Sequence, residues 1–600
     1  MITVIADCET DGLLPAMTKL HCVQIGAEEG DEATLYGDHP LCDAPLAEGL
    51  ARLRAADRIV GHNFLGFDLF AINRLHPGTV RVEQVADTLV LARMTHITER
   101  NHSLDAWGQR TGTLKGKYTG DYQTFDEEFA EYSRIDIHAG RALWGIVKHG
   151  LEWGGGKVYE IERNAAYCVA LQEQNGFSLD VARAQKLHGE IAEEMAVLEK
   201  EIAAIFPCFS RTEEFIPKVN NSKLGYKKGE VFVKRWSDSF NPRSRHHIAE
   251  ALIRDGWAPL DFTPTGQPQV DADTLRSVDH PGAKLLVRYL RHSKVLGAIL
   301  GAAKSKGYLQ LVKSDGRIYG RVNTLGATTW RMTHSNPNTA NVDKDERVRS
   351  LFIPRKGWDL VGCDGKEIQA RFLAHYLARY DGGTYAAKLT RGDKSKGTDG
   401  HSLNWEALKP FGCASRDGAK QAQYAKVFGC RAPRMWETLN EFRVKEGLPA
   451  IPKSKMQKVG QGALDALGRS MPGLDDLLRD VQTTGKKRGY LLGIAGGQVP
   501  VAAAHAALVS LLQNGEAVAM KLALGIFHFE YAPAAGYVYG RDWAYCSNVH
   551  DEVQFEAPPE HSHALGDLFS SCIEEAGRRL NMKCPLGGEA KVGPNWAITH

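Results

Sequence analysis

Several features are missing from the sequence, and each absence excludes a class of protein. The 11 cysteines include no Cys-x-x-Cys pair, so neither a disulfide framework nor a zinc site is indicated, and a reducing, cytoplasmic setting is expected. No apolar run approaches the roughly 20 residues that span a membrane. A strand-like segment at 2–6 opens the chain, without the basic region and cleavage site of a leader peptide. No Gly-x-x-x-x-Gly-Lys-Ser/Thr loop is present, so any phosphate chemistry must depend on carboxylates and metal ions.

The sequence also has no marked excess of one charge. Lys and Arg total 74 against 72 Asp and Glu, a formal net charge of +2. Net charge therefore neither indicates nor excludes a nucleic-acid partner, but local clusters do exist. Residues 416–458 contain ten basic and four acidic side chains, and residues 211–245 contain nine and four. Either segment would attract a phosphate backbone, although solvated basic loops are common.

A chain of 600 residues is too long for one hydrophobic core, so we expect two or more domains. The triplet Gly154-Gly155-Gly156 is the clearest linker signal and closes a first block of about 153 residues. An amphipathic helix is predicted at 181–206, a polar loop or small hairpin at 220–234, and short strands at 359–364 and around 549–555. The helix at 181–206 has a regular apolar side: Leu187, Ile191, Met195, Leu198 and Ile202.

The first block contains a set of acidic residues that could converge. Asp7 and Glu9 are two residues apart at a strand end and point to one face, while Tyr132 and Asp136 are four apart on one helical face. Asp68 lies between these pairs in the sequence. A lone Asp-x-Glu is usually a solvated strand end, but converging acids repel one another unless divalent cations neutralise them. Hard oxygen ligands select Mg²⁺ or Mn²⁺, and two such ions can activate water against a phosphodiester.

These pieces, in this order, resemble the proofreading 3′→5′ exonucleases of the DEDD type, Tyr subclass. The resemblance implies an RNase H-like exonuclease domain at 1–153. It also implies four metal ligands and one residue that positions the attacking water: Asp7, Glu9, Asp68 and Asp136, with Tyr132.

A second set of residues surrounds a predicted helix in the proline-free stretch 411–432. Arg416, Lys420, Tyr424 and Phe428 follow at steps of four and so form one stripe, and Ser415 can cap the helix. Such a stripe can hold a triphosphate at one end and a base at the other. The alternative is a solvated basic face beside two core aromatics.

Two aspartates flank this helix in the sequence. Asp364 ends the predicted strand 359–364, and Asp551 lies in the hairpin-like segment 549–555. Each could be a structural acid. Together, on either side of a cationic helix, they favour a two-metal phosphoryl-transfer site.

Across nearly its whole length the sequence resembles the family A, Pol I-like DNA polymerases, and most of all the replicative polymerases of short-tailed phages. The resemblance is carried by motif A at 364–371, the ladder at 416–429 as motif B, motif C at 549–552, and the C-terminal segment 591–600. It implies a multidomain α/β and α+β fold, with a right-hand polymerase domain at 154–600. The thumb would lie at about 160–310, the palm at about 311–400 and 500–600, and the fingers at about 401–499.

The resemblance also implies residue roles. Asp364, Asp551 and the backbone carbonyl of Gly365 would hold two metal ions, in addition to two in the exonuclease site. The incoming nucleotide would contact Arg416, Lys420 and His401 at its triphosphate. Tyr424 would lie against its sugar and base, Gln369 would lie at its sugar, and Phe428 would close over the templating pair. The minor groove and primer end would be contacted by Arg331, Gln513 and His550. Contacts of that kind check shape rather than sequence.

The sequence departs from the family pattern at some positions. Gln369 stands where glutamate is usual; it keeps the length of the gate against a ribose 2′-OH but loses the charge, so we expect sugar discrimination to persist. Lys366 replaces a usual serine and Val509 a usual asparagine. The segment at about 207–239 is short compared with the thumb insertion that recruits thioredoxin in a phage relative. Dependence on thioredoxin is therefore not expected, and the Lys-rich loop could grip duplex DNA directly.

The sequence thus predicts a phage-type, template-directed DNA polymerase with proofreading. It would act as a monomer on primer-template DNA and dNTPs in the cytoplasm of an infected bacterial host, with a helicase/primase and a single-strand-binding protein and without a membrane. A repair or translesion polymerase of family A is the alternative, and intact exonuclease acids weigh against it. A DNA-binding nuclease with a decayed polymerase half is a third possibility, and the intact Asp364, Asp551, Arg416 and Lys420 weigh against that.

Overall fold

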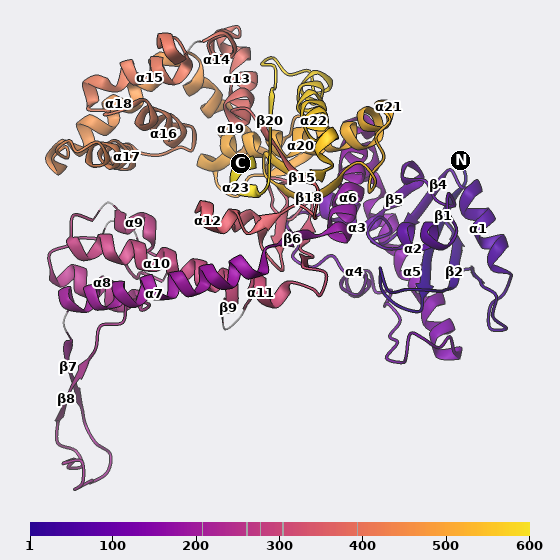
Figure 1. Cartoon of the computed structure of the whole chain (residues 1–600), viewed down its shortest axis with the longest axis horizontal. Coiled ribbons are helices and arrows are strands. Elements are labelled where there is room, and N and C mark those ends of the chain that lie inside the picture. Colours follow the sequence, from indigo (N-terminus) through magenta and orange to yellow (C-terminus); the bar gives the residue numbers. More distant parts are fainter. Residues whose placement is uncertain (207, 260–261, 264, 277, 303–304, 393) are drawn as a thin grey trace. The chain divides into compact units, whose positions relative to one another are not determined.

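The computed structural model describes residues 1–600 except 207, 260–261, 264, 277, 303–304 and 393 (Figure 1). The described residues form two compact units. One unit joins Met1–Leu179 to Lys313–His600, and the other is Asp180–Val312. The chain therefore leaves the first unit for residues 180–312 and then returns to it. None of the helices in the described residues combines the length and apolar content needed to cross a membrane.

A five-stranded sheet in the order β3-β2-β1-β4-β5 organises the N-terminal region. Its strands are β1 (Thr3–Thr10), β2 (Leu20–Ala27), β3 (Ala33–Tyr36), β4 (Arg58–Gly61) and β5 (Val85–Asp87). β1 runs antiparallel to β2 and parallel to β4. The helices of this region are α1 (Leu46–Ala55), α2 (Asp68–Leu75), α3 (Thr88–Thr95), α4 (Leu104–Thr111) and α5 (Glu127–Val147). β1 continues beyond the predicted strand-like segment 2–6, because Cys8 is buried and Glu9 still pairs with Cys22.

The glycine triplet separates two helical segments of the first unit. Gly154, Gly155 and Gly156 have φ values of 59°, 68° and 89°, at the end of the segment Lys148–Gly156. Left-handed backbone of this kind favours glycine. The following helix α6 (Lys157–Asn175) packs Val158 and Tyr159 into the N-terminal hydrophobic core. The triplet thus ends one helical run, and the chain stays in contact with the same core.

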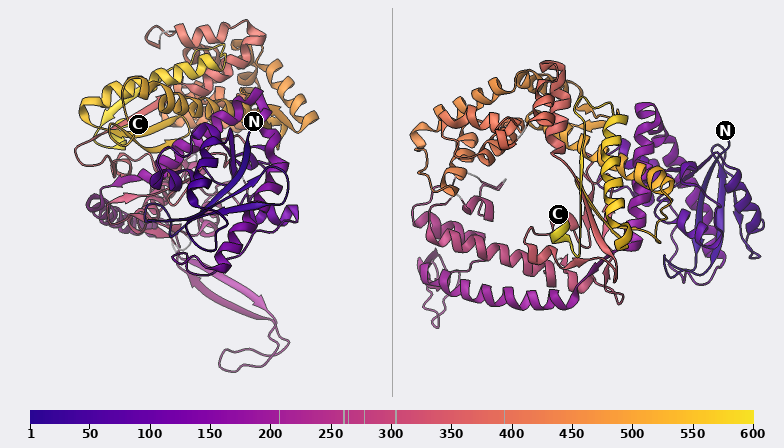
Figure 2. Two further views of the ribbon diagram at one scale, coloured as in Figure 1. Left: turned by 90° about the vertical axis from the view of Figure 1, so that its right-hand side faces the viewer. Right: turned by 45° about the horizontal axis from the view of Figure 1, so that its top comes forward.

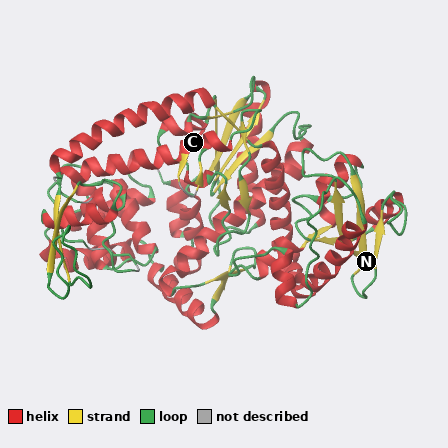
Figure 3. Cartoon of the chain, turned by 90° about the horizontal axis from the view of Figure 1, so that it is seen from below, coloured by secondary structure: helices red, strands yellow, loops and turns green. Residues whose placement is uncertain are grey.

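A four-stranded antiparallel sheet in the order β18-β19-β15-β20 organises the C-terminal region. Its strands are β15 (Asp359–Gly365), β18 (Ala544–Val549), β19 (Glu552–Ala557) and β20 (Gly588–Gly593). Helices α20 (Ala507–Ile526) and α22 (Pro559–Arg579) pack on each other, and α22 lies against β15 and β20 (Figure 1). Figure 3 distinguishes the helices of the chain from its strands by colour. The predicted strand 359–364 and the predicted hairpin are both confirmed, with His550 and Asp551 in the turn.

Short strands and a group of helices complete the first unit. The short strands are β6 (Phe177–Leu179), β11 (Arg317–Ile318), β12 (Arg321–Asn323), β13 (Thr333–Ser335), β14 (Phe352–Ile353), β16 (Tyr490–Leu492) and β17 (Gln498–Pro500). The helices are α12 (Glu346–Arg349), α13 (Ile368–Asp381), α14 (Thr384–Arg391), α15 (Gly400–Leu408), α16 (Arg416–Val427), α17 (Ala432–Lys445), α18 (Met456–Ser470), α19 (Leu474–Arg488), α21 (Ala532–Ala534) and α23 (Trp596–Thr599). The helix predicted from the stripe of four is therefore present as α16.

The second unit consists of helices and a long hairpin. Its elements are α7 (Val181–Ile205), α8 (Arg245–Arg254), α9 (Ala272–Arg276), α10 (Pro281–Leu300), α11 (Tyr308–Leu311), the short pair β9 (Gly301–Ala302) and β10 (Ser305–Lys306), and the hairpin strands β7 (Phe209–Phe215) and β8 (Phe232–Asp238). α7 confirms the predicted amphipathic helix, since all five predicted apolar positions are buried. The hairpin runs away from these helices (Figure 2). β7 ends before the predicted 220–234 segment and β8 begins inside it, at Phe232, so that this segment forms mainly the connecting loop.

Candidate active sites

Three carboxylates of the N-terminal sheet region converge. Oxygen atoms of Asp7 and Glu9, from β1, and of Asp136, from α5, all lie within 4.8 Å of one another. Asp68, the first residue of α2, is buried beside them and accepts a hydrogen bond from the Cys8 amide at 2.9 Å. The charge of the Asp7 carboxyl group contributes to the raised pKa of Asp68, after burial. The side chains that the sequence pattern groups together are thus close in space.

The acids of this cluster repel one another, because too few positive charges lie near them. Burial and the nearby Asp136 charge raise the pKa of Asp7 to about 7. Burial and the neighbouring acids also raise the pKa values of Glu9 and Asp68. Because the cluster offers only oxygen donors, its chemistry fits hard divalent cations such as Mg²⁺.

Lys115 lies at this cluster and is a residue that the sequence analysis missed. Its ammonium is 3.0 Å from Asp136 and 5.3 Å from the centre of the Tyr132 ring. Burial and the Asp136 charge raise the pKa of Tyr132, so its hydroxyl stays protonated as a donor. Lys115 is in a loop between α4 and α5, where no motif or periodicity marks it; only the tertiary structure brings it to Asp136.

The second pair of acids lies at the end of β15 and in the β18–β19 turn. The Gly365 amide donates to the Asp551 carbonyl at 2.9 Å, and Asp364 pairs in register with Glu552. The surrounding protein displaces water from Asp364 and, together with the charges of Asp551 and Glu552, raises its pKa to about 7. Burial likewise raises the pKa of Asp551. The antiparallel register therefore brings together two acids that are 187 residues apart in sequence.

The predicted stripe of side chains faces away from the hydrophobic core. Three of them, Arg416, Lys420 and Tyr424, belong to α16, and Phe428 directly follows it. The buried residues of α16 include Ala419, Ala422 and Val427, whereas Lys420 and Tyr424 are half-buried and Phe428 is 41% exposed. The Tyr424 and Phe428 ring centres are 6.0 Å apart. Ser415 caps the helix by accepting from the Gly418 amide, as predicted. Phe428 therefore does not belong to the core, and Tyr424 lies at its margin.

The residues at the start of α16 contact the start of α15. The Arg416 guanidinium bonds the Asp399 carboxylate at 2.6 Å, and Asp399 also caps α15. These bonds lower the pKa of Asp399 to about 2. His401 is only 1% exposed: Nδ1 is 3.0 Å from Oε1 of Gln423, and Nε2 is 3.6 Å from Glu367. His401 and Arg416 are thus neighbours, each held by a partner that the sequence analysis did not single out.

A buried glutamate connects two further candidates. Glu516, on α20, accepts hydrogen bonds from Arg331 and from Nε2 of Gln369 at 2.7 Å. Arg331 and His550 line one small cavity of about 10 Å³. Gln513 is half-buried three residues before Glu516 on the same helix. No sequence signal marks Glu516 as functional, because only the tertiary structure shows that Arg331 and Gln369 contact it.

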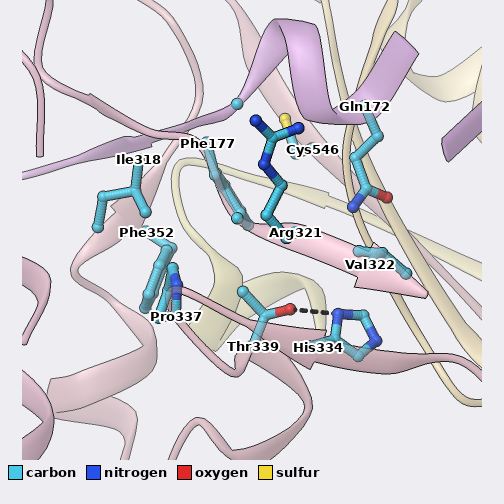
Figure 4. Close-up of a pocket in the computed structure, with 12 residues that line it drawn as sticks. Gln172, Phe177, Ile318, Arg321, Val322, His334, Pro337, Thr339, Phe352 and Cys546 are labelled. Atoms are coloured by element: carbon cyan, nitrogen blue, oxygen red, sulfur yellow. Dashed lines mark hydrogen bonds between the residues drawn. The ribbon is translucent and has the colours of Figure 1, made fainter. Parts of the chain in front are cut away.

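An enclosed cavity of about 20 Å³ lies among β6, β11, β13 and β14 (Figure 4). Phe177 and Phe352 form part of its wall, and the Thr339 hydroxyl is 2.9 Å from Nδ1 of His334. This volume is enough for a water molecule and far too small for a nucleotide. The candidate sites are therefore the clusters of acids and cations, and not this cavity.

Acids and cations gathered at the two sheets suit chemistry on phosphate esters. The chain belongs to a family of enzymes with that chemistry, DNA polymerase family A, whose sequence model matches residues 221–598.

Comparison with individual proteins supports the same assignment. The chain is 27% identical to the DNA-directed DNA polymerases of Escherichia phage T7 and Enterobacteria phage T3, with all of this chain and all of each relative covered. In fold it is similar to the polymerase domain of Pol1 from M. smegmatis in complex with DNA primer-template and dNTP. That likeness has a TM-score of 0.70 at 18% identity and covers 99% of this chain and 96% of that one.

These findings confirm the resemblance and the fold class predicted from the sequence. The protein is a template-directed DNA polymerase of the phage type, and enzymes of its family use divalent metal ions.

Proposed function

We propose that this polymerase has two separate active sites, one for nucleotide addition at Asp364 and Asp551 and one for 3′→5′ proofreading at the N-terminal acid cluster. The observation that carries the proposal is the presence of two distinct groups of acids with raised pKa values on two different sheets. Raised pKa values at converging acids are typical of functional sites, because folding alone would not favour such repulsion.

Each site would hold two Mg²⁺ ions, with Mn²⁺ as a possible substitute. Asp364, Asp551 and the Gly365 carbonyl would be the ligands in one site; Asp7, Glu9, Asp68 and Asp136 would be the ligands in the other. Both donor sets consist of oxygen atoms only, which suits these ions. When bound, the ions supply activation of the attacking oxygen and stabilisation of the leaving oxygen.

At the polymerase site, α16 would deliver the nucleotide. Arg416, Lys420 and the buried His401 would bind the triphosphate, because cationic side chains and phosphate oxygens form strong charge-assisted hydrogen bonds. Tyr424 would lie against the sugar beside Gln369, and Phe428 would cover the templating base pair. The exposure of Phe428 supports this role, since a core aromatic could not reach a base. Arg331, Gln513 and His550 would contact the primer end and the minor groove.

At the exonuclease site, the Tyr132 hydroxyl would orient the water that attacks the terminal phosphodiester. Its raised pKa supports this role, because a protonated phenol can both donate and accept a hydrogen bond. Lys115 would limit the repulsion between Asp136 and the entering phosphate.

The proposal assigns residues 1–153 to the exonuclease domain and 154–600 to the polymerase domain, with the thumb, palm and fingers at the limits predicted from the sequence. We also propose that the protein works as a monomer on primer-template DNA in the cytoplasm of an infected bacterium, with a helicase/primase and a single-strand-binding protein and without thioredoxin.

One primer-extension assay in Mg²⁺ tests the two-site proposal. With dNTPs the wild type should extend the primer, and without them it should degrade the 3′ end. Asp551→Ala should abolish extension and leave degradation, and Asp7→Ala should do the reverse. Loss of both activities in either variant would contradict two independent sites. A repair polymerase lacking proofreading would extend without degrading, and a nuclease with a decayed polymerase half would degrade without extending.

A further inference from the structure

A single buried carboxylate holds two of the proposed substrate-contacting side chains. Glu516 has no exposed surface. Its Oε1 accepts from Nε and Nη2 of Arg331 at 2.9 and 2.6 Å, and its Oε2 accepts from Nη2 at 2.8 Å. Oε2 also accepts from Nε2 of Gln369 at 2.7 Å. One carboxylate therefore joins a residue proposed for the primer end to a residue proposed for the nucleotide sugar.

The two helices that carry this contact are packed closely together. A Cβ atom at Gly515 would lie 2.4 Å from the Phe372 ring, so α20 approaches α13 as closely as only glycine permits. Phe372 follows Gln369 by three residues, close to one helical turn. The backbone positions of Gln369 and Glu516 are thus fixed within a closely packed core.

The contact also fixes which way the Gln369 amide points. An ionised carboxylate only accepts hydrogen bonds, so the amide must turn its NH₂ group toward Glu516 and its carbonyl oxygen away. Burial raises the pKa of Glu516 to about 7, and the bidentate Arg331 contact opposes that rise and favours the ionised form. A carboxylate in place of the half-buried Gln369 amide would lie about 2.7 Å from the buried Glu516 carboxylate, which is strongly unfavourable. An amide at 369 and an acid at 516 therefore require each other.

We propose that Glu516 is a positioning residue for nucleotide selection, which orients the Gln369 amide and the Arg331 guanidinium as one unit. The inference rests on the proposed places of Gln369 and Arg331. Its consequence is that discrimination between dNTPs and rNTPs depends on a side chain that does not itself reach the nucleotide. The charge of Glu516 also contributes to the raised pKa of Tyr424, on α16, after burial and the Glu367 charge.

Single-turnover incorporation of one dNTP and the matching rNTP tests this inference. We expect Glu516→Ala to reduce the preference for the dNTP by about tenfold or more, because both partners lose their anchor. Glu516→Gln, which is isosteric and folds most safely, should reduce it less. Ser510→Ala, on the same helix, is the matched control and should leave the preference unchanged. Thermal melts and 3′-end degradation by the same variants check the fold.

The mutual requirement is tested by a double-mutant cycle. Gln369→Glu alone should lower the efficiency of dNTP incorporation, and adding Glu516→Gln should restore at least about tenfold, since the two acids no longer face each other. If the two changes combine additively, or if folded Glu516→Ala retains the wild-type preference, the inference is overturned. A wild type that incorporates both nucleotides equally would instead contradict the place of Gln369 at the sugar, and the inference with it.

Discussion

At the scale of single residues, Lys115 balances the charge of the N-terminal acid cluster. It is the cation that contacts Asp136, and it also faces the Tyr132 ring. We predict that Lys115→Met lowers 3′-end degradation by about 10- to 100-fold, because the cluster loses the charge that offsets repulsion of the phosphate. Primer extension should be unchanged. The measurement is degradation of a labelled single strand without dNTPs.

Lys117 provides the matched control for this prediction. It lies two residues away in the same loop and is exposed. Lys117→Met should degrade DNA at the wild-type rate. Equal losses in both variants would indicate a general effect of loop charge on DNA binding, and not a role at Asp136.

At the scale of elements, the β7–β8 hairpin is the part of the second unit that suits contact with DNA. Its loop presents the exposed side chains of Lys223, Lys227 and Lys228. Changing all three to Gln should shorten the product made per binding event and reduce the slope of log affinity against log salt concentration, by up to about 0.9 for each lost phosphate contact. A salt titration of primer-template binding measures the slope.

A second triple variant on the same unit controls for the loss of charge. Lys186, Lys200 and Lys284 are exposed on α7 and α10. Their replacement by Gln should change the slope less than the hairpin variant does. An unchanged slope in the hairpin variant would exclude direct contact of these lysines with the DNA backbone.

At the scale of elements, some helices could be predicted from the sequence, whereas the ends of several strands could not. Helices α7 and α16 follow from periodic apolar positions and a cap, and these are local signals. The extension of β1 to Thr10 and the long strands of the hairpin were not predictable, because pairing with β2 and between β7 and β8 decides their ends.

At the scale of the whole molecule, clustered acids make stability depend on pH and on metal. The pKa values of Asp7 and Asp364 are raised in the folded state to about 7, so the folded protein binds more protons than the unfolded chain between about pH 4 and 7. Stability from these groups is present at low pH and is lost as pH rises through that window. Mg²⁺ should replace the missing protons and raise the melting temperature at pH 8.

The variant Asp7→Asn isolates this effect from other titrations. In EDTA it should melt above the wild type at pH 8, by about 2–4 °C for each kcal/mol of repulsion removed, and the difference should shrink at pH 5. Addition of Mg²⁺ should stabilise the variant less than the wild type. A melting difference independent of pH would contradict a raised pKa at Asp7.

The sequence by itself determined the family, and it predicted the acids of both proposed sites and the ladder of α16, because these depend on residue type at short spacing. Asp7 and Glu9 share a strand face, and Arg416 and Lys420 share a helix face, whatever the rest of the chain does. The tertiary structure alone decided the partners: Lys115 at Asp136, Asp399 at Arg416, and Glu516 between Arg331 and Gln369. These contacts join segments from 17 to 185 residues apart, and no local pattern encodes them. They exist because the packing of the elements brings these side chains together, and buried charged groups need partners.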